Sequence, residues 1–188
     1  MTLAQIMRFA LLQLDEDPAD IDEYADLFRM YANDGYTELI EQYAKPREIF
    51  TLCAGECGFV STADMDILRV AGVMRTRGDR HEQLPWMVAE DGTGIFVPVQ
   101  NEDVEVLAEV RKPPLVEDTD VPCLPESAQT ALVSYICWRH LLTGNLAKQS
   151  RAQAFLSLYV KQAAALRPQG MGGVHTMRGL YAATDIRR

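Results

Sequence analysis

Two aspartates one residue apart, Asp118 and Asp120, are the first residues of this 188-residue chain that could do chemistry. An Asp-x-Asp pair can hold a divalent metal ion, as it does in some sugar-transferring enzymes. Those enzymes place the pair in a nucleotide-binding α/β domain, whereas the sequence here has no strand–loop–helix pattern and no glycine-rich loop. Aspartates between prolines also bond nearby backbone N–H groups. We therefore favour a structural joint made of Asp118, Asp120, Pro122 and Pro125.

Cysteine spacing gives weak support for a metal site. Cys53 and Cys57 resemble half of a zinc site, but Cys123 and Cys137 are fourteen residues apart and no histidine pair accompanies them. Buried or idle thiols fit this spacing better. We expect no metal and no cofactor.

The three histidines, His81, His140 and His175, lie in three different sequence contexts. None lies beside a cysteine or serine in a recognisable nucleophile motif. A histidine and a cysteine need only meet in space, so the sequence leaves catalysis open without supporting it. We expect a protein that is not an enzyme.

The composition, 48% hydrophobic and 24% charged residues, is that of a soluble globular protein. The length fits one domain, or one domain with an insertion. The longest apolar run, LAQIMRFALLQL, is interrupted by Gln5 and Arg8 and is too short to span a membrane. It also lacks the features of a signal peptide, so we expect reduced thiols in a cytoplasmic compartment.

Charge is distributed unevenly along the chain. The net charge of −9 argues against a protein that binds nucleic acid over its whole surface. Residues 1–45 carry a net −7, residues 46–124 a net −8 and residues 125–188 a net +6. An acidic body and a basic C-terminal third could pair between copies. Solvated faces are the alternative, and charge alone favours them.

Helical periodicity dominates the N-terminal region. Thr2 can cap a helix that runs to about Leu14, and Asp20 can cap a second that runs to about Ala44. Gly35 in the second helix allows a kink. The first helix has apolar residues at helical spacing: Leu3, Ile6, Met7, Ala10, Leu11 and Leu14.

The rest of the chain completes an α+β, mainly α, fold. We predict a helical bundle, with two N-terminal helices in residues 1–45 and two C-terminal helices in residues 125–167. Short β-branched segments and an EDGTG hairpin turn predict a small antiparallel β-sheet inserted over residues 46–112. Residues 113–124 are a connector that ends with Pro125 at the first position of the third helix. In the last helix we expect the following side chains to face inward: Phe155, Leu156, Tyr159, Val160 and Ala164.

Residues 168–188 are predicted to form a flexible C-terminal tail. This segment has four glycines and little periodicity, yet it carries more hydrophobic groups than a typical solvated end. It could become ordered on a partner, or it could be a frayed terminus. The candidate partner-binding residues are Met171, Val174, His175, Met177, Leu180, Tyr181, Ile186, Arg187 and Arg188.

This layout resembles the head-to-tail adaptor (connector) proteins of tailed bacteriophages, which also occur in related prophages and gene-transfer particles. The likeness covers most of the chain in arrangement. It is carried by Pro114, Leu115, Asp118 to Asp120, Leu124-Pro125-Glu126, Leu132, Tyr135, Arg139 and the helix of Arg151, Phe155 and Tyr159. The β insertion is larger than in the minimal, nearly all-helical members.

The resemblance implies a structural virion protein at the neck, the head–tail junction, with assembly in the host cytoplasm. Such adaptors form a ring, commonly of twelve copies, beneath the portal protein. The ring extends the DNA channel, lets double-stranded DNA pass without specific binding, and docks tail or neck proteins. The C-terminal segment, here about residues 169–188, would contact the portal or a neighbouring subunit. No membrane is involved.

Three alternatives remain at this stage. The first is another neck or tail-completion protein, and the second is a small cytoplasmic helical module that binds other proteins. The third is an enzyme that uses a thiol, or a metal held by Asp118 and Asp120.

Overall fold

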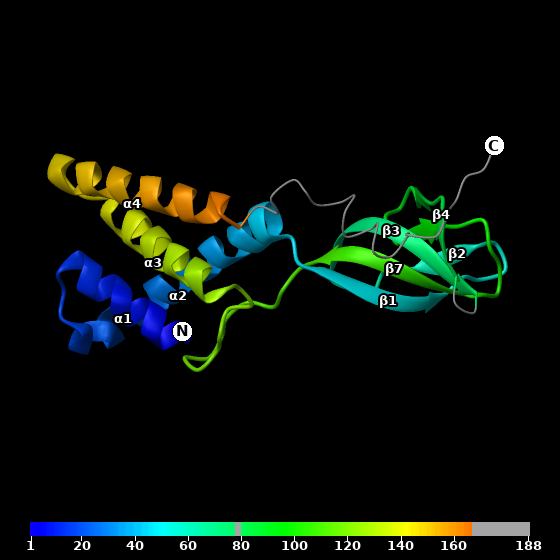
Figure 1. Cartoon of the computed structure of the whole chain (residues 1–188). Coiled ribbons are helices and arrows are strands. Elements are labelled where there is room, and N and C mark those ends of the chain that lie inside the picture. The colour runs from blue at the N-terminus through cyan, green and yellow to red at the C-terminus, as the bar shows by residue number, and fades with distance from the viewer. Residues whose placement is uncertain (78–79, 167–188) are drawn as a thin grey trace. The chain divides into compact units, whose positions relative to one another are not determined.

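The computed structural model describes residues 1–77 and 80–166, which form two compact units (Figure 1). The helical unit contains residues 1–44 and 112–166. The β unit contains residues 45–77 and 80–111. The predicted C-terminal tail lies outside the described residues. Among the described helices, none combines the length and the apolar character that a membrane span needs.

Helix α1 (Leu3–Leu14) begins where its sequence predicts. Thr2 is the N-cap, and its hydroxyl accepts a hydrogen bond from Gln5 N while the Gln5 side chain accepts one from Thr2 N. This reciprocal capping box satisfies two backbone donors that a helix start leaves without partners. All six apolar residues of the predicted stripe are buried.

Helix α2 (Ile21–Glu38) follows a short 3₁₀ turn (Pro18–Asp20) and continues as a π-helical turn (Leu39–Ala44). The backbone is α-helical at Gly35, where the sequence allowed a kink. A Cβ atom at this position would lie 2.8 Å from Cδ1 and Cγ of Tyr135. Glycine is therefore needed here because α2 and the Tyr135 ring approach closely, and not because the helix bends.

Helix α3 (Glu126–Leu141) is the centre of the helical unit. It packs against α1, α2 and α4 (Leu146–Ala164), and its buried residues include both apolar and polar side chains. Two inward predictions for α4 are wrong, because Val160 and Ala164 are exposed while Ala152 and Ala163 are buried. The packing of α4 on α3 selects small residues where the helices approach, which hydrophobicity alone does not reveal.

The β unit contains two antiparallel sheets. Four strands form the larger sheet, in the order β1-β7-β3-β4. Three short strands form the smaller sheet, in the order β2-β6-β5. The strands are β1 (Arg47–Cys53), β2 (Phe59–Ser61), β3 (Ile67–Arg77), β4 (Arg80–Leu84), β5 (Met87–Val88), β6 (Gly94–Phe96) and β7 (Asp103–Val110).

The predicted fold class, a mainly helical bundle with a small inserted sheet, is wrong. The described residues hold four α-helices and seven strands, and the strands bury a hydrophobic core of their own. Val60 and Ile95 of the smaller sheet share this core with Val73, Val104 and Val106 of the larger one. Because both sheets close over one core, the β unit is a second compact body and not a minor insertion.

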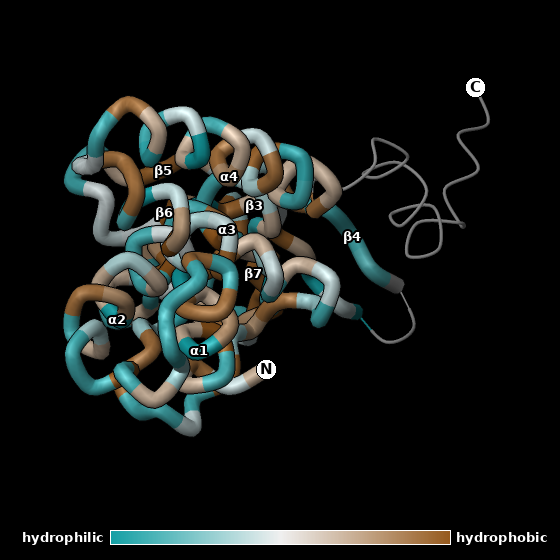
Figure 2. The backbone as a smooth tube through the Cα atoms, turned by 90° about the vertical axis from the view of Figure 1, so that its left-hand side faces the viewer, coloured by the Kyte–Doolittle hydropathy of each residue, from teal (hydrophilic) through white to brown (hydrophobic). Residues whose placement is uncertain are grey.

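Strand β4 shows why the sequence underestimates the β unit. It is drawn in the hydrophilic colour in Figure 2, and its residues, RHEQL, show no alternation of apolar and polar side chains. It lies at an edge of the larger sheet, where only one neighbour supplies hydrogen bonds. An edge strand can be polar because much of it faces water, so hydrophobic periodicity cannot detect it.

Candidate functional site, the connector joint

Asp120 closes a tight turn in the connector (residues 113–124). Its Oδ2 accepts hydrogen bonds from the backbone N–H groups of Val116, at 2.8 Å, and Glu117, at 2.9 Å. These two hydrogen bonds stabilise the charged carboxylate and lower the pKa of Asp120 below its usual value, and the bond from Glu117 has the larger effect. The carboxylate is therefore engaged with its own backbone.

Asp118 has a different partner. Its Oδ1 lies 2.9 Å from Nη2 of Arg29 on α2, an ion pair at the surface of the helical unit. The two aspartates thus have different partners: Asp118 pairs with a guanidinium, and Asp120 binds the backbone of its own turn. Across residues 1–77 and 80–166, no three His, Cys, Asp or Glu side chains are grouped so that they could hold a metal ion.

The connector backbone also caps helix α1. Leu3 N donates to Asp120 O at 2.8 Å, and Ala4 N donates to Asp118 O at 3.0 Å. These two N–H groups belong to the first turn of α1, where a helix has no carbonyl partners of its own. The carbonyls of the two aspartates, more than a hundred residues away in sequence, satisfy them.

Helix α2 binds the connector through its polar side chains. Asn33 Oδ1 accepts a hydrogen bond from Leu115 N at 2.7 Å, and Asn33 Nδ2 donates to Leu115 O at 2.9 Å. Further along, the Tyr36 hydroxyl accepts a hydrogen bond from Cys123 N at 3.1 Å. The connector is thereby fixed to α2 near both of its ends.

The prolines lie where the connector meets α3. Pro122 is buried, and its carbonyl accepts a hydrogen bond from Leu124 N at 2.7 Å. Pro125 occupies the N-cap position and α3 begins at Glu126, so Pro125 precedes the first helical position instead of filling it. Its carbonyl accepts from Ala128 N at 2.8 Å, and the Gln129 side chain donates to Leu124 O at 3.1 Å.

The described thiols and imidazoles lie in separate surroundings. Cys137 is buried, and burial raises the pKa of its thiol to about 12. His140 lies edge-on to the rings of Tyr24 and Phe28, with centroid separations of 5.7 and 5.5 Å. His81 contacts the Thr76 hydroxyl at 3.0 Å. His175 lies outside the described residues, as do all the predicted partner-binding residues of the tail.

Arg139 on α3 lies among aromatic rings. Its guanidinium carbon is 5.2 Å from the centroid of Tyr31, 5.8 Å from Tyr135 and 5.9 Å from Trp138. Asp34 on α2 lies 3.7 Å from the same guanidinium. Cation–π and ionic contacts together tie α3 to α2.

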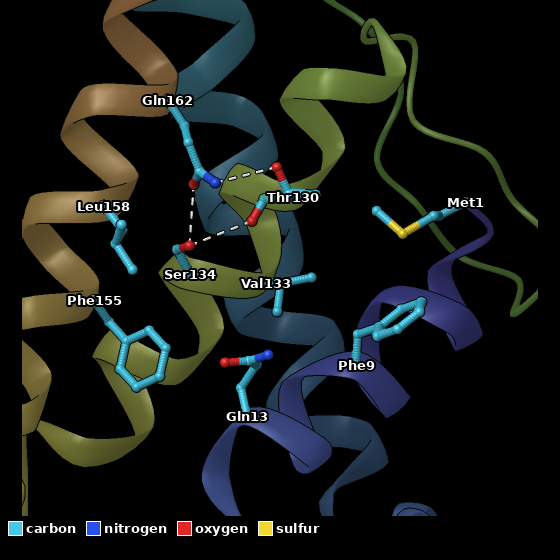
Figure 3. A pocket seen from close by; sticks show the side chains of 9 residues that line it. All are labelled: Met1, Phe9, Gln13, Thr130, Val133, Ser134, Phe155, Leu158 and Gln162. Atoms are coloured by element: carbon cyan, nitrogen blue, oxygen red, sulfur yellow. Dashed lines mark hydrogen bonds between the residues drawn. The ribbon is translucent and has the colours of Figure 1, made fainter.

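A surface groove lies between α1 and α4, with α3 as its floor (Figure 3). Its volume is about 270 Å³. Its apolar lining includes Phe9, Val133, Phe155 and Leu158. The sequence did not predict this groove, because it arises from three helices that meet in space.

The comparison with protein families decides the identity. The family model for the SU10 adaptor protein matches residues 1–179. The chain belongs to the SU10 adaptor protein family. This is a family of phage head-to-tail adaptors, so the resemblance drawn from the sequence is confirmed. No curated protein matches the chain.

The adaptor is accordingly a structural bacteriophage protein of the virion neck, and its family interacts with portal and tail proteins. Two of the residues that carried the resemblance, Asp118 and Asp120, lie in the connector joint. Arg151 joins α4 to α1, since it pairs with Asp15 at 2.9 Å and bonds Gln13 O. These residues hold the adaptor's helices together.

Sequence reasoning missed the α2 partners of the connector. The sequence does not indicate Arg29 and Asn33, because their partners Asp118 and Leu115 lie 89 and 82 residues away. One signal was present: asparagine is a poor residue for a helix interior, so Asn33 needs a tertiary role. Arg29 is also the only basic residue in α2 of the adaptor.

Proposed function

We propose that the adaptor forms a ring, of twelve copies, beneath the portal protein, where it extends the DNA channel and docks the tail. The observation that carries this proposal is the match of residues 1–179 to the head-to-tail adaptor family. We further propose that assembly takes place in the host cytoplasm, without a membrane, a cofactor or a catalytic step.

The distribution of charge supports contacts between unlike faces. A ring requires heterologous contacts, in which one surface of a copy meets a different surface of the next. Residues 1–45 carry a net −7, and residues 125–188 carry a net +6. Such opposite surfaces would favour head-to-tail pairing over pairing of like faces.

Acidic side chains also suit a channel through which DNA slides. Seven acidic residues between positions 15 and 26 are exposed, and the segment contains no basic residue. Carboxylates near a duplex repel its phosphates and so prevent tight binding. We propose that this surface, or another acidic one, lines the channel and leaves DNA free to pass.

The connector joint gives every copy the same geometry in this proposal. Asp118, Asp120, Pro122 and Pro125 lie in or beside the segment that returns the chain to α3. Hydrogen bonds from α1 and to α2 fix that segment at several points. A closed ring requires subunits with one shape, because small errors in orientation accumulate around it.

The C-terminal tail is proposed to contact the portal or a neighbouring copy. Its candidate residues run from Met171 to Arg188 and lie outside the described residues. Ordering a segment on a partner costs about 1–2 kcal/mol per residue, which only the partner's contacts offset. Docking would therefore make assembly sequential.

Deletion of residues 169–188 tests this role. The truncated chain should keep a cooperative thermal transition and the helix and strand signals of circular dichroism, because the described helices and strands lie before the cut. It should fail to co-sediment with portal assemblies that bind the full chain. Normal binding by a folded, truncated chain would show that the tail is not the portal contact.

A further inference from the structure

The groove between α1 and α4 is apolar and open to solvent. Phe9 on α1 is 48% exposed and Leu158 on α4 is 49% exposed, and the lining also includes Val133 on α3 and Phe155 on α4. Aromatic and leucine side chains gain most when a partner removes them from water. The groove thus has the character of a docking site for a short apolar segment.

Polar groups at one end of the groove already satisfy each other. Ser134 Oγ donates to Gln162 Oε1 at 3.0 Å, and Gln162 Nε2 donates to Thr130 Oγ1 at 3.2 Å (Figure 3). These groups need no ligand to complete their hydrogen bonds. Apart from these groups and Gln13, the groove offers an occupant mainly apolar side chains.

An acidic turn follows the other end of the groove. Arg151 binds Gln13 O and Asp15 there, where α1 ends. The next residues, Glu16, Asp17 and Asp20, are exposed and carry three further negative charges. A segment that is apolar first and basic afterwards would complement the groove and then the turn.

The adaptor's own C-terminal segment has this order of residues. It begins directly after α4, whose Gln162 lies at the polar end of the groove. Five of its larger apolar residues, Met171, Val174, Met177, Leu180 and Tyr181, come first with Arg178 among them, and Arg187 and Arg188 come last, after Asp185. Residues 167–170 include a proline and a glycine, which suit a reversal of the chain.

The length of this segment fits the groove. Seven residues of helix separate Phe155 from Gln162, a distance of about 10 Å along α4. The eleven residues from Met171 to Tyr181 span about 16 Å as a helix and about 36 Å when extended. Either length exceeds the distance of about 10 Å between Phe155 and Gln162.

We propose that, before assembly, residues 171–181 bind the α1/α4 groove of their own chain, with Arg187 and Arg188 on the acidic turn. Attachment to α4 gives the segment an effective concentration in the millimolar range, so modest contacts suffice. The groove would shield the apolar side chains of the tail until the portal displaces them. This inference goes beyond the proposed ring, and only the displacement step rests on the proposed portal contact.

Hydrogen–deuterium exchange on the isolated full-length chain tests the proposal. Leu158→Asp places a charge in the groove, and Val160→Asp is the matched control, because Val160 is 47% exposed on the same helix and outside the groove. We expect the amides of residues 171–181 to exchange about tenfold more slowly in the wild type and in the control than in Leu158→Asp. Unchanged exchange in α1 and α3 would show that the variants are folded.

The remaining outcomes overturn the proposal. Tail amides that exchange at the rate of an unstructured peptide in the wild type would exclude binding. Equal effects of Leu158→Asp and Val160→Asp would exclude the groove as the site. Protection that grows over about a hundredfold range of protein concentration would assign the groove to the tail of another copy. None of these results bears on ring formation, which needs the portal and is measured separately.

Discussion

Asn33 binds both backbone groups of Leu115, accepting from its N–H at 2.7 Å and donating to its carbonyl at 2.9 Å. The pair joins the middle of α2 to the start of the connector. Leu115 is itself buried in the helical core, so its backbone groups have little access to water. The start of the connector is therefore held by a side chain that lies 82 residues earlier in sequence.

Replacement of Asn33 by alanine should destabilise the helical unit. It leaves two backbone groups of a buried residue without partners, at a cost of about 1–3 kcal/mol for each group that water cannot reach. Urea unfolding followed by circular dichroism would measure the change. Gln153→Ala, on the exposed side of α4, is the control and should stay within about 0.5 kcal/mol of the wild type. If Asn33→Ala were as stable as Gln153→Ala, water would be supplying the hydrogen bonds that Asn33 makes to Leu115, and the prediction would be contradicted.

Gly35→Ala should also destabilise the protein, although alanine is the better helix former by about 1 kcal/mol. Its Cβ would lie 2.8 Å from the Tyr135 ring, and overpacking of this kind costs about 1–3 kcal/mol. Gly72→Ala in β3 is the matched control, since nothing lies within 4 Å of a Cβ there. Thermal unfolding of both variants would compare them. A gain in stability at Gly35 would contradict the close approach.

Three thiols should react in the native chain and one should not. Cys53, Cys57 and Cys123 are exposed, whereas Cys137 is buried and its pKa is raised to about 12. The reactive species is the thiolate, which Cys137 scarcely forms near pH 8. A colorimetric thiol titration should count three groups in native buffer and four in denaturant. A fourth thiol that reacts at once in native buffer would contradict the burial of α3.

His140 should make stability fall in acid. Burial, and then the positive charge of Lys148, lower its pKa below 6.5 in the folded chain. The unfolded chain binds the proton more readily than the folded chain. The contribution of neutral His140 to the free energy of unfolding is therefore complete above about pH 6.5, and it is lost as the pH falls through the pKa of His140 in the folded chain. Urea unfolding between pH 7.5 and pH 5 should show a steeper loss for the wild type than for His140→Gln. The exposed His81→Gln control should follow the wild type.

The sequence predicts local features of this fold better than distant ones. The α1 stripe and its Thr2 cap depend on residues within a few positions, and both predictions are confirmed. The sequence allows a local kink at Gly35, but the structure explains the glycine by its close approach to Tyr135 on another helix. Strand β4 is an edge strand whose polar sequence carries no periodic signal.

The candidate site follows the same rule. The sequence drew attention to the connector because Asp118, Asp120 and the prolines are close together in the chain. The sequence could not identify Arg29 or Asn33 as part of the site, because these residues meet their partners in the connector only after folding. The groove between α1 and α4 could not be predicted from the sequence either, because Phe9 and Leu158 come from opposite ends of the described chain.

The most direct test of the central claim is the mass of the assembly in which the protein is found. The chain would be tagged in its producing cells, recovered gently and weighed by native mass spectrometry. Our account predicts a large complex that contains many copies of this chain together with an oligomeric portal protein. A lone chain, or a complex with a single cellular partner, would contradict the ring and favour a cytoplasmic interaction module.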